Sequence, residues 1–472
     1  MKKKCDLILI NPPMATHRPD RYRVGTMFVP KNIRISCINT GVLSLATYLD
    51  SKGFKVTILD LYKYEDVTEA SGALELFLLE NEAAYYGISC SSGFSYLETL
   101  EIAQLIKRND SRAVVITGGQ HIGPLKDWPL KECSAIDVNV MYEGETILEH
   151  ILGGGKLENL QGVARRNVGE VLVNFEYPSF VSLDDMPPLK FSLYPEYNKY
   201  TPYIEESRGC SSRCNFCISS FTNKGRIRVK SSRIFEKELE SLISYFPDAD
   251  MVAVLASSFG MNVQNTIEIT ESLRKHQIKW TTEIRVDSPW NQNNLLEKMV
   301  SSGLVILNVG AESLSSDILI RMNKTKNTER YIAQAQELIG ACARHANLML
   351  KFNIVMYQGE TPKTFSDTLR ILFANKDYFA TVQFSPLFSF PGSRLYESLL
   401  GDGALCHDAF WDSIHMYPIN LSPFYDAESA AVLCREMEKI FSDPEGYIKA
   451  NSYKWHKTSR DEQEEIKKSS WR

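Results

Sequence analysis

The chain has 472 residues, a length typical of two or three domains with a sizeable core. Its composition, 44% hydrophobic and 24% charged, excludes intrinsic disorder or a fibrous architecture as a description of the whole. The formal net charge of −5 provides no overall attraction to nucleic acid or to an anionic membrane.

The chain begins with a lysine-rich segment and a short apolar run that ends at Asn11, Pro12 and Pro13. That run is too short for the hydrophobic part of a signal peptide, and no stretch of about 18 apolar residues occurs elsewhere. We therefore expect a cytoplasmic protein that does not span a membrane. In such a long chain, ten cysteines favour metal binding or catalysis over disulfides.

The first third of the chain alternates short apolar runs with stretches of helical periodicity, around Val42–Leu49 and Leu97–Arg108. The runs predict buried strands at Leu7–Ile10, Lys55–Leu59, Ala84–Ser89, Ala113–Thr117 and Val138–Tyr142. This alternation is typical of an α/β domain with a parallel sheet covered on both faces, and a doubly wound, Rossmann-like fold is the simplest choice. We assign it to residues 1–155 and expect a connector at 156–200, with a short strand at Val171–Phe175.

Small and polar residues follow four of these predicted strands. They include Asn11, Pro12, Ser89, Ser91, Gly118, Gly119, His121, Glu143 and Gly144. In doubly wound sheets, ligands bind beyond the carboxyl ends of the strands, so a polar ligand site is one interpretation and a set of tight turns is the other. Neither a GxGxxG nor a Walker A sequence occurs, which disfavours a dinucleotide or a P-loop phosphate site.

Three clustered cysteines, Cys210, Cys214 and Cys217, have the spacing CxxxCxxC. A zinc site needs a fourth ligand, and no histidine lies between His150 and His276. Iron–sulfur clusters are held by thiolates on short loops, and three thiolates on a four-iron cluster would leave one iron open. A cluster is therefore the leading interpretation, and zinc with a distant ligand is the alternative.

This motif resembles that of the radical S-adenosylmethionine (SAM) superfamily. The resemblance implies a [4Fe-4S] cluster on the three catalytic cysteines, SAM on the open iron, cleavage to a 5′-deoxyadenosyl radical, and Phe216 against the adenine. A helix is predicted at Ser232–Phe246 and another at Thr328–Ala341. Strands are predicted at Tyr203–Ser207, Met251–Ala256, Trp280–Val286, Val305–Val309, Met349–Met356 and Val382–Pro386. This is the strand count of the family's partial (β/α)6 barrel, which we assign to residues 201–400.

Several strand ends also resemble family positions that contact SAM. Ser257 and Ser258 lie where the family holds the amino group, although an acidic pair is common there, and Arg285 follows the next strand. Glu312 and Ser313 resemble the segment whose glutamate contacts SAM. Each residue alone could equally belong to an ordinary ion pair or turn.

The combination of the two halves resembles the cobalamin-binding, class B methyltransferase-like members of the superfamily. The DxHxxG signature, which supplies an axial histidine to cobalamin in other proteins, is absent, so we expect the cofactor to bind without that histidine. His121 is the nearest candidate contact, and a hydrogen-bonded turn histidine is the alternative interpretation. The expected reaction is cobalamin-dependent C-methylation of an unactivated carbon in a small molecule. Dehydration, cyclisation, rearrangement or epimerisation is the alternative, and a non-catalytic corrinoid or iron–sulfur sensor is a further one.

An external electron donor such as flavodoxin or ferredoxin is implied by the resemblance. Nucleic acid is not expected as a partner, although Lys224–Lys230 is basic. Residues 401–472 form a small C-terminal extension, read either as an aromatic cap or as a packed helical subdomain. Nothing in the sequence identifies the substrate.

Overall fold

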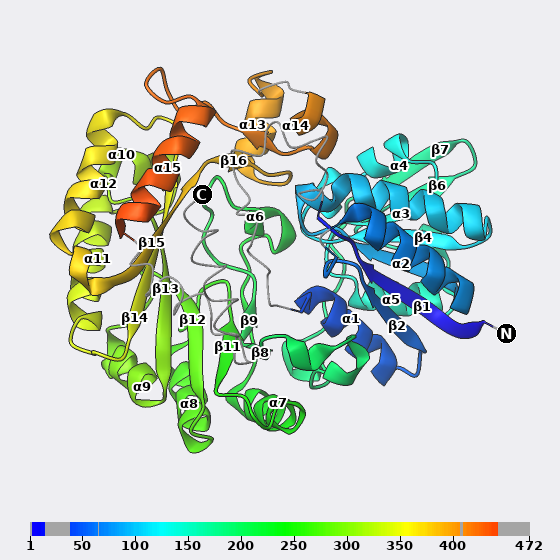
Figure 1. Cartoon of the computed structure of the whole chain (residues 1–472), viewed down its shortest axis with the longest axis horizontal. Coiled ribbons are helices and arrows are strands. Elements are labelled where there is room, and N and C mark those ends of the chain that lie inside the picture. Colours follow the sequence, from blue (N-terminus) through cyan, green and yellow to red (C-terminus); the bar gives the residue numbers. More distant parts are fainter. Residues whose placement is uncertain (1, 15–37, 65, 406–408, 442–472) are drawn as a thin grey trace.

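The computed structural model describes residues 2–14, 38–64, 66–405 and 409–441. Two largely parallel sheets dominate it, and they lie side by side with helices around each (Figure 1). No helix in these ranges is long and apolar enough to cross a bilayer. The last 31 residues of the predicted extension, with Trp455 and Trp471, fall outside the described ranges.

The N-terminal sheet has seven strands in the order β2-β1-β3-β4-β5-β6-β7. The strands are β1 (Lys3–Asn11), β2 (Val56–Asp60), β3 (Asn81–Ser89), β4 (Val114–Gly118), β5 (Val138–Val140), β6 (Val163–Asn167) and β7 (Glu170–Asn174). The first five are parallel, whereas β6 and β7 are antiparallel and extend the sheet past β5. The stretch predicted as a connector therefore contributes a hairpin to this sheet, and the strand predicted at Val171–Phe175 is β7.

Helices cover both faces of this sheet. They are α1 (Thr40–Ser51), α2 (Val67–Glu80), α3 (Tyr96–Asn109), α4 (Trp128–Glu132) and α5 (Glu145–Leu152). Along β1, Leu7 and Leu9 belong to the core under α1 and α5, while Ile8 and Ile10 belong to the core under α2 and α3. Because alternate residues of a strand face opposite ways, a continuous apolar run is what this arrangement requires. The predicted doubly wound fold is confirmed.

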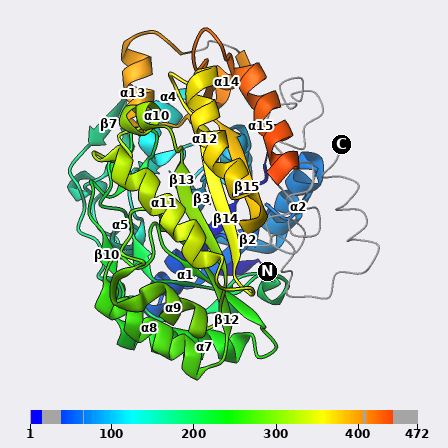
Figure 2. The ribbon, with the colours of Figure 1, turned by 90° about the vertical axis from the view of Figure 1, so that its left-hand side faces the viewer.

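The second sheet has six parallel strands in the order β15-β14-β13-β12-β11-β8. They are β8 (Tyr203–Glu205), β11 (Met251–Leu255), β12 (Lys279–Arg285), β13 (Leu304–Glu312), β14 (Met349–Met356) and β15 (Phe379–Pro386). The helices between them cover the outer face (Figures 1 and 2), and they are α7 (Ser232–Tyr245), α8 (Val263–Lys275), α9 (Leu295–Ser301), α10 (Ser316–Arg321), α11 (Thr328–Cys342) and α12 (Pro362–Ala374). Because β8 and β15 are the two edges of this sheet, the barrel is partial, as predicted.

Short elements join and cap the two sheets. The strand β9 (Ser207–Arg208) pairs with β10 (Arg228–Val229), and α6 (Ser219–Thr222) lies between them in the chain. The C-terminal part comprises β16 (Phe388–Ser389), α13 (Arg394–Gly401), α14 (Ala409–Ile414), β17 (Tyr417–Pro418) and α15 (Ala427–Phe441). Helix α15 packs along β15, and α14 contacts α3 of the N-terminal sheet. This part thus lies against both halves of the molecule (Figure 1).

Candidate active site

The cysteine loop follows β9 and is held against the far side of the barrel by backbone and amide hydrogen bonds. The Asn215 N–H donates to the Met322 carbonyl at 2.9 Å, and the Asn215 carbonyl accepts from the Leu395 N–H at 2.9 Å. The side chain of Asn323 donates to the Arg213 carbonyl at 2.7 Å. These contacts fix the loop at several points, so the cysteine positions are set by the barrel rather than by the loop alone.

None of the three cysteines forms a disulfide, and all three lie on the same short loop. Cys214 is buried and Cys210 and Cys217 are half-buried. Burial raises the pKa of the Cys217 thiol, and charge on the other two raises it further. The three Sγ atoms do not all lie within 4.8 Å of one another, which a single-ion site would require. A cysteine-only donor set of this kind fits a multi-iron cluster better than a zinc ion.

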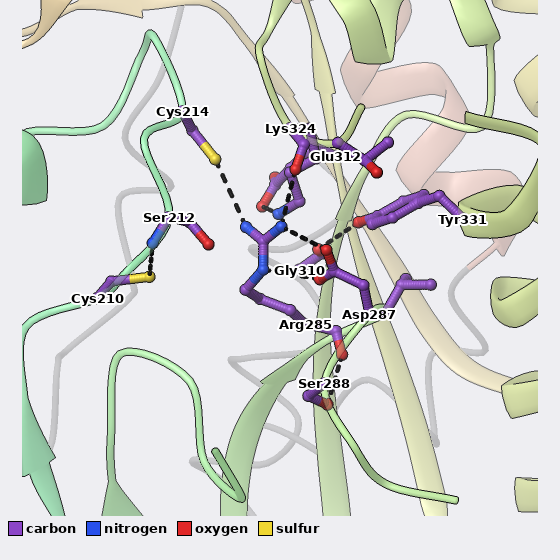
Figure 3. A network of polar contacts seen from close by, with 12 residues as sticks. Cys210, Ser212, Cys214, Arg285, Asp287, Ser288, Gly310, Glu312, Lys324 and Tyr331 are labelled. Carbon is purple, nitrogen blue, oxygen red and sulfur yellow. Dashed lines mark hydrogen bonds and ion pairs between the residues drawn. The ribbon is translucent and has the colours of Figure 1, made fainter. Parts of the chain in front are cut away.

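Arg285, at the end of β12, connects the cysteine loop to the strand ends of the barrel (Figure 3). Its Nη1 donates to Cys214 Sγ at 3.5 Å, and its Nε and Nη2 donate to Asp287 at 2.8 and 3.0 Å. A further bond runs from Nη2 to the Lys324 carbonyl at 2.9 Å. Salt-bridging to Asp287 raises the pKa of Arg285 against the opposing effect of burial, so this cation stays charged beside the sulfur.

Glu312 ends β13 and accepts a bond from Lys324 Nζ at 3.0 Å. Its φ of +65° lies in the left-handed region, which is unfavourable for a residue with a side chain and is typical of functional sites. The register of β13 against β14 shifts between Gly310 and Glu312, a bulge that redirects the side chains beyond it.

The residues predicted to contact SAM differ in burial and in hydrogen bonding. Phe216 is half-buried, with its ring centroid 6.1 Å from that of Tyr357. Ser257 is exposed, whereas the Ser258 hydroxyl is buried without a hydrogen-bond partner among the described residues. Such an orphaned hydroxyl fits a ligand contact.

Ser313, also predicted as a SAM contact, has hydrogen-bond partners within the chain. Its hydroxyl lies 3.3 Å from that of Thr368 on α12 and accepts the Ser315 N–H at 3.1 Å. The side chain therefore packs outward against a covering helix, because the bulge at the end of β13 has changed its direction.

A cavity of about 750 Å³ lies between the carboxyl ends of the two sheets. Seven of the residues predicted to contact cobalamin line it: Asn11, Ser89, Ser91, Gly118, Gly119, Glu143 and Gly144. The barrel contributes Glu205, Ser207, Arg208 and Ser257. Both sheets thus present their ligand-binding edges to one space, and its volume is within the range of cofactor sites.

Gly119 shows why this edge needs glycine. Its φ is +113°, and a Cβ atom there would lie 2.6 Å from the Cys90 carbonyl oxygen. No other residue fits both conditions, so glycine lets the chain pass close to the Cys90 backbone at the edge of the cavity.

His121 and Pro12, the other two residues predicted as cobalamin contacts, do not line the cavity. The His121 Nε2 donates to the Ile414 carbonyl at 2.7 Å, and burial lowers the pKa of this imidazole to about 3. His121 is the hydrogen-bonded histidine of the alternative interpretation, and it joins the N-terminal sheet to the C-terminal part. No histidine occurs among the described residues that line the cavity.

An ion-pair network across the cavity was not predicted from the sequence. Arg208, two residues before Cys210, donates to Glu145 at 2.7 Å, Glu205 at 2.8 Å and Glu143 at 3.1 Å. Glu143 and Glu145 belong to the N-terminal half and Glu205 to the barrel, so Arg208 joins the two. Burial and the neighbouring Glu145 raise the pKa of Glu143, and Arg208 opposes that rise.

The basic stretch Lys224–Lys230 is also engaged within the chain. Arg228 pairs with Glu143 and donates to the Val181 carbonyl at 3.0 Å. Lys230 forms a buried pair with Glu238, and Lys224 Nζ lies 4.4 Å from the ring centroid of Tyr177. These three cations therefore have internal partners.

Two family models match the chain in the same order as its two sheets. The B12 binding domain model matches residues 31–152, and the Radical SAM superfamily model matches residues 204–372. The protein is a radical SAM enzyme with a B12-binding domain. Its cofactors are accordingly a [4Fe-4S] cluster, SAM and cobalamin.

Relatives among characterised and curated proteins are distant. An uncharacterized methyltransferase of Pyrococcus horikoshii is 26% identical over 68% of this chain and 70% of its own length. The bacteriochlorophyllide d C-12(1)-methyltransferase of Chlorobaculum tepidum is 20% identical over 61% of this chain and 60% of its own. A tRNA-2-methylthio-N(6)-dimethylallyladenosine synthase of Campylobacter jejuni is 23% identical, but the match spans 48% of this chain and about half (53%) of the synthase.

Two solved structures share the fold of this radical SAM enzyme. The methyltransferase TsrM of Kitasatospora setae, with cobalamin and a [4Fe-4S] cluster bound, aligns with a TM-score of 0.66 and 16% identity over 87% of this chain and 76% of its own. The enzyme OxsB, with aqua-cobalamin and SAM bound, aligns with a TM-score of 0.71 and 17% identity over 99% of this chain and 72% of its own. At these identities the likeness establishes the architecture.

Proposed function

We propose that this enzyme methylates an unactivated carbon of a small molecule by cobalamin-dependent radical chemistry. The observation that carries the proposal is the cavity of about 750 Å³ that the B12-binding domain and the mouth of the barrel share. A cofactor held by one domain would face a substrate held by the other, and proximity of this kind decides the fate of a reactive intermediate.

The barrel's own residues would bind and orient SAM. Cys210, Cys214 and Cys217 would hold the cluster, and the Arg285 guanidinium would donate a hydrogen bond to a cluster thiolate, as it does to Cys214 Sγ at 3.5 Å. Glu312 and the orphaned Ser258 hydroxyl offer polar contacts to SAM. When bound, the cluster and SAM supply a 5′-deoxyadenosyl radical, and an external donor such as flavodoxin or ferredoxin would supply the electron.

The other wall of the cavity would hold cobalamin, whose chemistry is methyl donation. Gly118 and Gly119 keep the backbone close to the cavity, and the hydroxyls of Ser89 and Ser91 and the carboxylate of Glu143 provide polar contacts. These residues would hold the cofactor through backbone and polar side-chain contacts.

A small molecule is the favoured substrate class. One solved TsrM complex contains tryptophan as its substrate together with a SAM analogue. Nucleic acid is disfavoured because Lys224, Arg228 and Lys230 have partners within the chain and so do not form a free basic surface.

Anaerobic reconstitution with iron, sulfide and hydroxocobalamin tests the proposal. We expect a retained corrin absorbance band and, with SAM and reductant, formation of both 5′-deoxyadenosine and S-adenosylhomocysteine. Cys214→Ala should lose the cluster and both products, whereas Cys342→Ala, a buried cysteine far from the motif in sequence, should keep them. A preparation that forms 5′-deoxyadenosine but retains no corrin and forms no S-adenosylhomocysteine would favour the non-methylating alternative.

A further inference from the structure

Deeper in the barrel than the cysteine loop, neighbouring strands carry a polar layer. Glu283 on β12 pairs in register with Asn308 on β13, and Asn308 pairs with Lys351 on β14. Neighbours paired in a parallel sheet direct their side chains to the same face. Glu283 precedes Arg285 by two residues, about 7 Å along the strand, and therefore shares the face from which Arg285 reaches Cys214.

Gly310 lets charged side chains approach the backbone closely beside this layer. A Cβ atom there would lie 2.9 Å from Glu312 Oε1, 3.7 Å from Lys324 Nζ and 3.9 Å from Glu283 Oε1. Three charged groups therefore converge on Gly310, at a position where any larger residue would crowd them. Glu283 of the polar layer thus lies near the Glu312 end of β13.

Glu283 is the carboxylate of this layer, and no salt bridge joins it to a lysine or arginine among the described residues. It is solvent-exposed and accepts no hydrogen bond from any residue in the described ranges. Surrounding protein raises the pKa of its carboxyl, and the negative charge of Glu312 raises it further, against the weaker effects of Lys324 and Lys351. Lys324 is already bonded to Glu312 at 3.0 Å. An incoming cation would stabilise the ionised Glu283 carboxylate against both the surrounding protein and the repulsion from Glu312.

Amide side chains complete the layer. Asn353 pairs in register with Gly310 on one side and with Gln383 on the other, so these amides continue the face of Glu283 across three strands. Amide groups both donate and accept hydrogen bonds, which suits a polar molecule with several functional groups.

We propose that the substrate carries a primary amine that binds Glu283, with Asn308, Asn353 and Gln383 contacting its other polar groups. The inference rests on the proposed function, because it takes the interior of the barrel as the substrate site. A small molecule held by Glu283 would lie one side-chain layer below Arg285 and the cysteine loop. Glu283 would then select the substrate by charge and fix which carbon faces the radical.

Equilibrium dialysis of the anaerobic holoenzyme tests this inference with two amines, tryptamine and phenethylamine, and their neutral counterparts, tryptophol and 2-phenylethanol. We expect at least one amine to bind ten-fold or more tightly than its alcohol. Glu283→Gln should abolish that preference, Glu283→Asp should keep part of it, and Glu271→Gln, an exposed glutamate on α8, should leave it unchanged. The inference is overturned if neither amine is preferred, or if the preference survives Glu283→Gln.

SAM binding provides the second arm, because SAM could also contact Glu283. We expect the dissociation constant for SAM to agree within two-fold between wild type and Glu283→Gln, and a ten-fold loss would assign Glu283 to the SAM site instead. Failure of the proposed function has a different signature. An enzyme with the amine preference but no retained corrin would contradict methylation alone, and one that forms both SAM products without the preference would contradict this inference alone.

Discussion

Replacing Arg208 with glutamine should weaken the junction between the two sheets. Arg208 donates to Glu143, Glu145 and Glu205, and to the Ser44 hydroxyl at 2.7 Å. The Arg208 side chain is 15% exposed and that of Glu145 is 8% exposed, so each charge depends on the other for its solvation. Glutamine keeps a similar length but leaves the carboxylates without their shared cation.

The size of the effect follows from burial. Removing one partner of a buried ion pair costs about 3–5 kcal/mol, and the lower end applies because Glu143 and Glu205 keep some contact with water. At about 2–4 °C per kcal/mol for domains of 150–250 residues, a loss of about 3 kcal/mol lowers the thermal midpoint by about 6–12 °C.

Scanning calorimetry of the full chain at pH 7 measures this shift. Arg344→Gln is the matched control, since Arg344 is 64% exposed and lies 3.6 Å from Glu297, and such surface pairs contribute at most about 1 kcal/mol. Adding Glu145→Gln to Arg208→Gln should recover part of the loss by removing one unpaired charge. The expected shift for Arg208→Gln is about 6–12 °C. A thermal midpoint within about 2 °C of wild type would refute the conclusion that this network stabilises the junction between the two sheets.

Three further predictions concern the cavity, the pH dependence and the cluster. Gly119→Ala should lower both the thermal midpoint and corrin retention more than Gly154→Ala, which has φ +78° but open space around it. Burial raises the pKa of Glu360 and Glu438 from 4.5 to about 7, so the folded chain retains protons that the unfolded chain releases. The free energy of unfolding should therefore fall as pH rises from about 4.5 through about 7. In Glu438→Gln, the denaturation midpoint should change less with pH across that range than it does in wild type. Arg285→Gln should lower the reduction potential of the cluster in a titration followed by electron paramagnetic resonance, and an unchanged potential would contradict the hydrogen bond to sulfur.

The buried strands could be predicted because burial on both faces requires a local run of apolar residues. Leu7–Ile10 is apolar at every position since both faces of β1 are covered, and this needs no knowledge of distant residues. The strand β6 was missed for the opposite reason. It carries Arg166, whose guanidinium is satisfied by the carbonyls of Ile136 and Cys133, both at 2.8 Å, so tertiary contacts make a charged residue acceptable within a strand.

Site residues could be predicted where the chemistry fixes their spacing in the sequence. They could not be predicted where the local backbone decides which way a side chain points. The three cysteines must share a short loop to hold one cluster, so their motif is visible in the sequence. His121 and Ser313 follow strand ends as expected, but a turn and a bulge direct their side chains to Ile414 and Thr368 instead. Arg208 was missed because its partners Glu143 and Glu145 lie more than 60 residues earlier in the chain.

The position of Arg208 links the two halves of the chemistry. Its backbone pairs with Arg228 of β10, its side chain joins Glu143 and Glu145 of the B12-binding domain, and Cys210 follows two residues later. A displacement of the B12-binding domain therefore pulls on the same short segment that carries the first cluster cysteine. Because catalysis by proximity tolerates little misplacement, a single arginine in this segment is an efficient way to keep the shared cavity and the cysteine loop in register.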